Sequence, residues 1–200
     1  MKGSLIIVGF IVLGTICGVC HLLPFDIAET NISYYALCAL MFSVGLSVGN
    51  DPQTLKNFRS LNPRLVFLPI MTILGTLAGS AAVSLILTHR SITDCLAVGS
   101  GFGYYSLSSI FITEYKGAEL GTIALLANIS REILTLLAAP LLVRWFGNLA
   151  PISAGGATTM DTTLPIITRT AGQQFVVVSI FHGFVVDFSV PFLVTLFCSI

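Results

Sequence analysis

Long apolar stretches separated by short polar ones make up this chain from one end to the other. A helix needs about 20 mostly apolar residues to cross the hydrocarbon layer of a bilayer. Seven segments reach or approach that length, and the stretches between them are too short for a soluble domain. The pattern therefore predicts an all-α polytopic helical bundle that forms one transmembrane domain over residues 1–200. The expected spans are residues 3–23, 33–49, 65–88, 92–113, 118–143, 153–170 and 174–199.

Two of these spans contain sequences that interrupt a helix. Residues 99–109 place three glycines at alternate positions, and each glycine weakens a helix by about 1 kcal/mol relative to alanine. Residues 153–170 are rich in Ser and Thr and include Asp161 and Pro165, which lacks a backbone donor. Lipid cannot satisfy the freed backbone groups, so such breaks persist only inside protein or beside water. We therefore predict discontinuous or re-entrant segments near 99–109 and 153–170, as in inverted-repeat transporters. The alternatives are glycine-mediated packing for the first and a polar loop outside the membrane for the second.

Composition agrees with lipid as the main solvent. Apolar residues make up 55% of the chain and charged residues only 9%, whereas soluble domains carry about 25% charged residues. Basic and acidic residues cancel and no basic cluster occurs, which argues against nucleic acid as a partner. Five cysteines lie in apolar runs, and the Cys17-Gly-Val-Cys20 spacing lacks a second pair. We therefore expect no disulfide, no metal site and no cofactor.

Basic residues in the short loops predict an orientation. The apolar run at the N-terminus exceeds a signal-peptide core and has no clear cleavage site, so we interpret it as a retained first span. Residues 50–64 carry three basic residues, whereas the preceding loop carries only acidic ones, so residues 50–64 are expected in the cytoplasm. Seven crossings would then place Lys116 and Arg169 inside, and Arg90, Arg144 and the C-terminus outside.

The span 118–143 is apolar except near its centre. Asn128, Arg131, Glu132 and Thr135 follow the i, i+3, i+4, i+7 spacing of one helix face. A charge at mid-bilayer costs about 2.5–3.5 kcal/mol, so such residues face a cavity or a partner and mark transport pathways. The alternative is an Arg131–Glu132 ion pair that only stabilises packing, although adjacent helical residues point about 100° apart. The spacing favours a polar working surface around Glu132.

The last span adds two more groups that can titrate. An unperturbed histidine changes charge near neutral pH, so His182 could relay protons, or it could be a hydrogen-bonded packing residue. Asp187 lies in the same expected helix, nearer its middle.

No enzyme signature appears: we find no nucleophile elbow, phosphate-binding loop, zinc pattern or paired catalytic carboxylates. We therefore predict transport rather than catalysis and assign no catalytic residue. Three alternatives stay open. One is a transporter of another small organic substrate, such as an anion bound by Arg131 and Arg169. Another is a channel that uses the Gly99–Gly103 loop as a filter. The third is a membrane enzyme built on Glu132, His182 and Asp161.

Several motifs occur in one order between residues 100 and 195, and together they resemble the LysO-type L-lysine exporters of bacteria. The matching stretches are Gly101-Phe-Gly-Tyr-Tyr-Ser-Leu-Ser108 with Thr113-Glu114, Asn128-Ile-Ser-Arg-Glu132 with Pro140, Gly156-Ala-Thr-Thr-Met-Asp-Thr-Thr-Leu-Pro165 with Arg169-Thr170, and His182-Gly-Phe184 with Pro191. Before residue 90 the likeness rests mainly on hydropathy. The resemblance implies a multi-pass protein of the bacterial cytoplasmic (inner) membrane that exports L-lysine, and close analogues such as thialysine.

The resemblance also implies a partner. Members of that family extend roughly a hundred residues further at the N-terminus, so this chain resembles the C-terminal part of a split exporter. A small membrane subunit would supply the remaining spans, or the chain would form a homo-oligomer. The family is thought to need a pair of intramembrane acidic residues, and Glu132 matches the one expected in this region.

The physics is compatible with this substrate. Lysine is a net cation, and moving one charge outward costs about 2.3 kcal/mol per 100 mV of membrane potential, so exchange for inward-moving protons would favour export. Our hypothesis is that Glu132 holds either a proton or the substrate ammonium group. Further expected contacts to the substrate or the ion are Asn128, Arg131, Asp161, His182, Tyr105, Ser106, Ser108 and Thr163.

Overall fold

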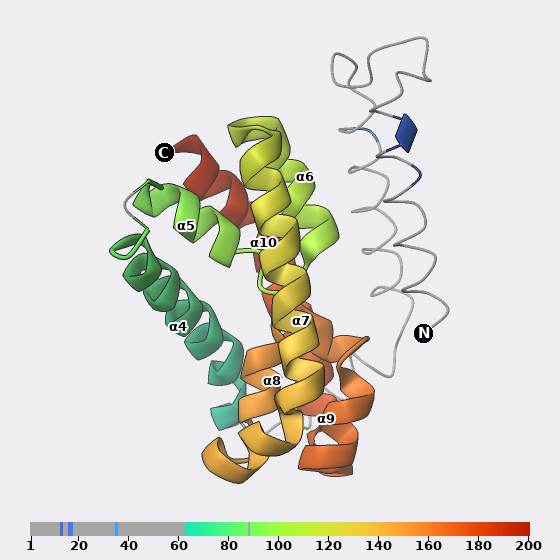
Figure 1. The fold of residues 1–200 in the computed structure, drawn as a ribbon. Coiled ribbons are helices and arrows are strands. Elements are labelled where there is room, and N and C mark those ends of the chain that lie inside the picture. Colours follow the sequence, from blue (N-terminus) through green and yellow to red (C-terminus); the bar gives the residue numbers. More distant parts are fainter. Residues whose placement is uncertain (1–12, 14–15, 18–34, 36–62, 88) are drawn as a thin grey trace. The chain divides into compact units, whose positions relative to one another are not determined.

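The computed structural model describes residues 13, 16–17, 35, 63–87 and 89–200. Contacts divide the chain into two units, residues 1–43 and 44–200. The features discussed below belong to the second unit (Figure 1). The expected spans 3–23 and 33–49 and the basic residues Lys56 and Arg59 lie outside the described residues, as does Cys20 of the Cys17–Cys20 spacing.

Every regular element within the described residues is a helix, which confirms the all-α class for this part of the chain. Three helices are long and apolar enough to cross a membrane: α4 (Phe67–Ser84), α7 (Ala118–Phe146) and α10 (Val176–Ser199), the last preceded by the short 3-10 helix η4 (Gln173–Phe175). They correspond to the expected spans 65–88, 118–143 and 174–199. Large apolar side chains on α4 and α7 stay exposed, among them Met71, Leu134 and Leu137, as lipid-facing surfaces require.

Both expected interruptions are present as breaks in the helices. The first segment forms α5 (Ile92–Gly99) and α6 (Tyr105–Lys116), separated by residues 100–104. The second forms α8 (Ala150–Gly155), the 3-10 helix η3 (Gly156–Met160) and α9 (Leu164–Ala171). A further 3-10 helix, η2 (Pro63–Val66), precedes α4. We call residues 92–116 the first hairpin, with its tip at 100–104, and residues 150–171 the second hairpin, with its tip at 156–163.

Charged side chains join the two ends of the first hairpin. Lys116 Nζ, at the end of α6, lies 3.9 Å from Asp94 Oδ1, in the first turn of α5. Arg90, just before α5, pairs with Glu119 in the first turn of α7. Because these pairs connect the start of α5 with the end of α6 and the start of α7, the first hairpin enters and leaves at one end of the unit (Figure 1).

An apolar cluster joins the two ends of the second hairpin. It contains Ile152 of α8, Ile167 and Ala171 of α9, and Val178 near the start of α10. Val143, from the end of α7, packs against it. Since α7 runs for 29 residues between the two hairpin bases, or about 43 Å at 1.5 Å per residue, the second hairpin enters from the opposite end (Figure 1).

This arrangement corrects the predicted sidedness. Counting residues 92–113 as a crossing placed Arg90 and Lys116 on opposite sides, but the contact between Lys116 and Asp94 brings both to the same end. The second hairpin likewise returns to the end it started from. If residues 50–64 are cytoplasmic, Lys116 now lies outside and Arg144 inside, because the first hairpin returns to its own side and does not cross the membrane. Arg169 stays inside and the C-terminus stays outside, because the second hairpin removes a second crossing and the two changes cancel.

Candidate functional site

The tips of the two hairpins touch. Ala157 N in the second tip donates to Phe102 O in the first, at 3.0 Å. Gly156 has a φ of 64°, and a Cβ built there would lie 2.1 Å from Phe102 O. At Gly103, with a φ of 95°, a Cβ would lie 3.2 Å from Gly155 O. Only glycine provides both the backbone conformation and the space for this approach.

Asn128, near the middle of α7, holds the first tip. Its Oδ1 accepts from Gly103 N at 2.7 Å, and its Nδ2 donates to Ala124 O at 2.9 Å. Longer contacts of 3.4 Å join Nδ2 to Val98 O and Ser108 Oγ. Asn128 is buried, so a single amide contacts the backbone of α5, the backbone of the tip and the Ser108 side chain of α6.

Arg131, one turn further along α7, holds the second hairpin. Its Nε donates to Ala154 O at 2.8 Å and one terminal nitrogen donates to Ser153 O at 3.0 Å, where α8 ends. The other terminal nitrogen lies 3.4 Å from Thr76 Oγ1 of α4. The guanidinium carbon also lies 5.9 Å from the ring centre of Phe102, within the range of a cation–π contact.

These contacts answer the ion-pair alternative. The ion pairs found among residues 63–87 and 89–200 are Arg90–Glu119 and Lys116–Asp94, and neither involves Glu132. Arg131 instead binds backbone carbonyl groups that the break leaves free.

His182 links three elements at the same depth. Its Nε2 lies 2.9 Å from Thr72 Oγ1 of α4, and its Nδ1 lies 3.3 Å from Thr159 Oγ1 in the second tip. Thr159 Oγ1 also donates to Ser179 O and to Gly156 O, at 2.9 and 2.8 Å. His182 is fully buried and bonded on both ring nitrogens, so its geometry fits a residue that holds the tip in place.

Two of the other expected site residues are also tied into the hairpins. Ser108, buried in α6, donates to Tyr104 O at 2.8 Å. Thr163 is buried at the end of the second tip, and its Oγ1 lies 3.2 Å from Thr158 Oγ1. Both hydroxyls therefore serve the tips themselves and are not directed to an open surface.

A second group of side chains forms an acidic surface beside the tips. Glu132 and Asp161 both lie close enough to Tyr105 to interact electrostatically with its phenol. Asp161 is exposed, Glu132 and Tyr105 are half-buried, and neighbouring Ser106 is half-buried as well. Asp161 and Asp187 both interact electrostatically with Tyr104, and Asp161 also interacts electrostatically with Asp187. We call Tyr104, Tyr105, Glu132, Asp161 and Asp187 the acidic cluster.

The sequence therefore predicted two kinds of residue without separating them. Asn128, Arg131, Ser108, Thr163 and His182 hold the two tips. Glu132, Asp161, Tyr105 and Ser106 lie at or beside the surface that a substrate could reach. Their roles in binding stay predictions. Such a cluster can bind an ammonium group or protons. Among the residues that the structure describes, no three His, Cys, Asp or Glu side chains are grouped to hold a metal ion.

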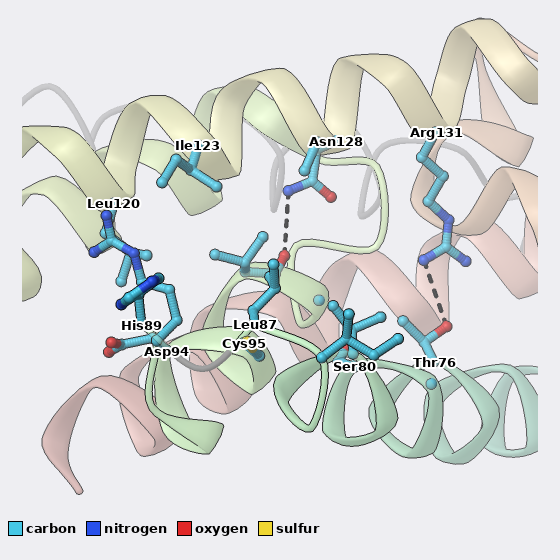
Figure 2. Close-up of a pocket in the computed structure, with 17 residues that line it drawn as sticks. Thr76, Ser80, Leu87, His89, Asp94, Cys95, Leu120, Ile123, Asn128 and Arg131 are labelled. Atoms are coloured by element: carbon cyan, nitrogen blue, oxygen red, sulfur yellow. Dashed lines mark hydrogen bonds between the residues drawn. The ribbon is translucent and has the colours of Figure 1, made fainter.

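A cavity of about 830 Å³ lies between α4, α5 and α7, and no residue of the acidic cluster lines it (Figure 2). Thr76, Asn128 and Arg131 line it at the depth of the tips. Arg90 and Asp94 line it at the base of the first hairpin. The remaining wall is mostly apolar, and the side chains of Asn128 and Arg131 project from α7 toward the cavity (Figure 2).

Three residues of the site were missed from the sequence. Thr72 and Thr76 lie on α4 and bind His182 and Arg131. Their i, i+4 spacing, continued by Ser80 and Ser84, was the available signal, because it places a row of hydroxyls on one face of α4. Phe102 offers no such signal, because its role depends on its backbone carbonyl and on a φ of 45°.

Comparison with known proteins now places the chain. The family model of the lysine exporter LysO matches residues 8–198. A protein of Escherichia coli (strain K12) named lysine exporter LysO is 36% identical over 196 residues, which are 98% of this chain and 64% of that relative. A protein of Haemophilus influenzae (strain ATCC 51907 / DSM 11121 / KW20 / Rd), described as a candidate lysine exporter, is 35% identical over 98% of this chain and 96% of its own length. No solved structure matches the chain significantly.

The apolar helices and these bacterial relatives define a multi-pass membrane protein. The chain belongs to the lysine exporter LysO family. This confirms the resemblance seen in the motifs of residues 100–195. The chain spans 64% of the length of the Escherichia coli relative and nearly all of the Haemophilus influenzae one.

Proposed function

We propose that this chain exports L-lysine from the bacterial cytoplasm, as a secondary transporter of the inner membrane or as its larger part. One observation carries the proposal: two hairpins enter from opposite ends and meet beside a cluster of carboxylates. Transporters with inverted repeats bind substrates where interrupted helices meet near the bilayer midplane. Glu132 lies at the middle of α7, at that depth.

The orientation follows from the corrected sidedness. With residues 50–64 in the cytoplasm, the base of the second hairpin lies at the cytoplasmic side, with Arg144 and Arg169 near it. The base of the first hairpin, with Arg90 and Lys116, lies at the outer side. The two hairpins then have the opposite orientations that an inverted-repeat architecture requires.

Glu132 is the proposed exchange site. A carboxylate can hold a proton or a substrate ammonium group, but it cannot hold both well. Export moves a net positive charge against the membrane potential, at about 2.3 kcal/mol per 100 mV, and inward proton movement can offset that cost. Because Glu132 is half-buried and interacts electrostatically with Tyr105, an ammonium group there would have the carboxylate and the phenol oxygen as acceptors.

The substrate carboxylate needs a separate partner. The helix α6 begins at the tip with Tyr105 and Ser106, and the N-terminal end of a helix favours negative charge. Arg131 is less suitable, since its nitrogens already contact Ser153, Ala154 and Thr76. Thialysine carries the same two ammonium groups and carboxylate, so we expect the same site to accept it.

The alternatives receive less support from the geometry. A filter needs free carbonyl groups, but those of Gly99, Gly101, Phe102 and Gly103 each accept a backbone hydrogen bond. An organic-anion site would use Arg131, whose donors are already engaged by the second hairpin.

We also propose that the working transporter contains protein in addition to these 200 residues, because the match covers only 64% of the Escherichia coli relative. A small membrane subunit, a further part of the same polypeptide or a second copy could supply it. Purification of the chain from its native membrane, followed by mass spectrometry of the intact complex, would identify which of these occurs.

Reconstitution tests the role of Glu132. In proteoliposomes that contain the chain and any co-purified subunit, Glu132→Gln should abolish both lysine counterflow and proton-driven lysine flux. Glu114→Gln is the matched control, since Glu114 is exposed on α6 outside the acidic cluster, and it should transport like the wild type. Wild-type flux in Glu132→Gln would contradict the assignment, and a wild-type chain that moves no lysine would contradict the proposed substrate.

A further inference from the structure

Asp187 is the most unusual ionisable group of the membrane helices. It lies near the middle of α10, it is only 3% exposed, and its Oδ1 is buried without a hydrogen-bond partner among the residues that the structure describes. A buried carboxylate that is ionised and unpaired is very unfavourable, so Asp187 must hold a proton or face a bound cation. Retention of an aspartate at such a place needs a reason other than packing.

Among the described residues, the charged group that interacts electrostatically with Asp187 is another carboxylate, Asp161 of the second tip. Tyr104, from the first tip, interacts with both carboxylates. Helix α4 carries no titratable side chain between Phe67 and Ser84. In α5, Asp94 lies at the outer base, beside Lys116.

Other charged groups near α10 are directed elsewhere. His182, on α10 itself, bonds to Thr72 and Thr159. Arg169, in the last turn of α9, is exposed near the opposite base. Within the described part of the chain, Asp187 and Asp161 therefore form a carboxylate pair without a counter-ion.

We propose that Asp187, together with Asp161, forms a second cation site in this chain, and that this site, rather than Glu132, binds the coupling proton, so that Glu132 binds only the substrate ammonium group. This inference rests on the proposed export function. A proton fits better than a metal ion, because a metal ion needs several oxygen ligands and the buried Oδ1 has no partner.

Asp161 connects the two sites. It interacts electrostatically with Tyr105, as Glu132 does, and it interacts electrostatically with Asp187. A nearby positive charge favours the ionised form of a carboxylate. Lysine bound at Glu132 therefore promotes release of the proton from Asp187, and a proton at Asp187 weakens lysine binding. Proton antiport requires such coupling. The proton at Asp187 and the lysine ammonium group at Glu132 each disfavour binding of the other, although they occupy different carboxylates.

The test separates proton coupling from substrate binding. Lysine counterflow, with lysine on both sides and no pH gradient, requires substrate binding but no net proton movement. In proteoliposomes, Asp187→Asn should keep counterflow within about threefold of the wild type. Its lysine flux driven by a pH gradient should be lower than that of the wild type by a factor of about ten or more. Asp187→Glu should recover part of the driven flux.

A second readout uses purified protein in weakly buffered detergent with a pH indicator. Addition of L-lysine to the wild type should release protons, and Asp187→Asn should release fewer while still being stabilised thermally by lysine. Asp94→Asn, the same substitution at the outer base of the first hairpin, is the control and should behave like the wild type in both assays.

Several results would overturn the proposal. The Asp187→Asn variant could show the same pH-driven lysine flux or the same proton release as the wild type, or it could fold and yet lose counterflow. Lysine flux in the wild type could also follow a sodium gradient at constant pH. If Asp187→Asn does not fold, Asp161→Asn decides, since unchanged proton release there contradicts the pair. Failure of the export function itself looks different, because the wild type would then show no counterflow at all.

Discussion

The two hairpins meet at their tips, but different forces hold their bases. The first base is joined by Arg90–Glu119 and Lys116–Asp94, which are partly exposed pairs that typically contribute at most about 1 kcal/mol each. The second base is packed in the apolar cluster around Ile152, where removal of a large side chain typically costs about 2–5 kcal/mol. An element that must move during transport needs a base that opens at low cost. We therefore expect the first hairpin to be the moving one, with the second as its fixed support.

The contacts that α7 makes with the two hairpins differ in the same direction. It holds the first tip through one neutral amide, Asn128, whereas it holds the second hairpin, near the end of α8, through the guanidinium group of Arg131 with two carbonyl partners. Hydrogen bonds from charged donors contribute about 1.5–3 kcal/mol, compared with about 1 kcal/mol for neutral ones. The bases of the hairpins and their contacts with α7 thus both indicate that the second hairpin is the more stable one.

The largest expected effect is the loss of the contact between the tips. Gly156→Ala would place a Cβ 2.1 Å from Phe102 O at a φ of 64°, so backbone strain of about 1–3 kcal/mol adds to a steric clash with a rigid backbone atom. We expect little folded protein, measured as monodisperse yield and thermal unfolding in detergent. Gly75→Ala is the control, because a Cβ there meets nothing within 4 Å and alanine favours the helix. Equal yields for the two variants would show that the tips need not touch.

Arg131→Met should have the next largest effect. It keeps the length of the side chain but leaves Ser153 O and Ala154 O without donors, which we expect to cost about 2–4 kcal/mol. Thermal unfolding should show the loss, and hydrogen exchange should localise it to residues 150–163. Exchange that rises in the first hairpin instead would contradict the assignment of Arg131 to the second.

Asn128→Ala should destabilise less and at the other hairpin. It leaves Gly103 N without an acceptor, at an expected cost of about 1–3 kcal/mol. Faster hydrogen exchange should appear around residues 100–108. Asn148→Ala, at an exposed position between α7 and α8, is the matched control and should leave both hairpins unchanged. A loss as large as that of Arg131→Met would remove the difference between the tips.

The smallest effect belongs to the base of the first hairpin. A double-mutant cycle with Arg90→Ala and Glu119→Ala should give a coupling energy of at most about 1 kcal/mol, reduced further at high salt. Thermal unfolding at low and high ionic strength measures it. A coupling energy of several kcal/mol that salt does not change would mean that this base is as rigid as the apolar one.

Much of the fold could be predicted because it depends on local pattern. The spans 65–88, 118–143 and 174–199 follow from their length and apolar composition, since lipid requires helices there. The glycines of residues 99–103 and the polar run after Ser153 marked both interruptions. The sidedness of residues 92–113 could not be predicted, because a span and a hairpin of two half-length helices have the same composition. The Lys116–Asp94 and Arg90–Glu119 contacts distinguish them.

The candidate site divides in the same way. The cost of a charge in an apolar helix was enough to single out Arg131 and Glu132. Spacing alone also assigned both to one surface, although the structure gives them different surroundings. Arg131 binds the backbone of the second hairpin, and Glu132 lies beside Tyr105.

By itself, the sequence determined that this chain is helical, that it lies in a membrane, where its helices break and to which family it belongs. These properties depend on local composition and on short motifs. The tertiary structure decided that the hairpins enter from opposite ends, which residues hold their tips, and that Asp161 of the second tip interacts electrostatically with Asp187 of α10. The physical reason is that these features depend on contacts between segments far apart in the chain, and the same local pattern is compatible with several such pairings.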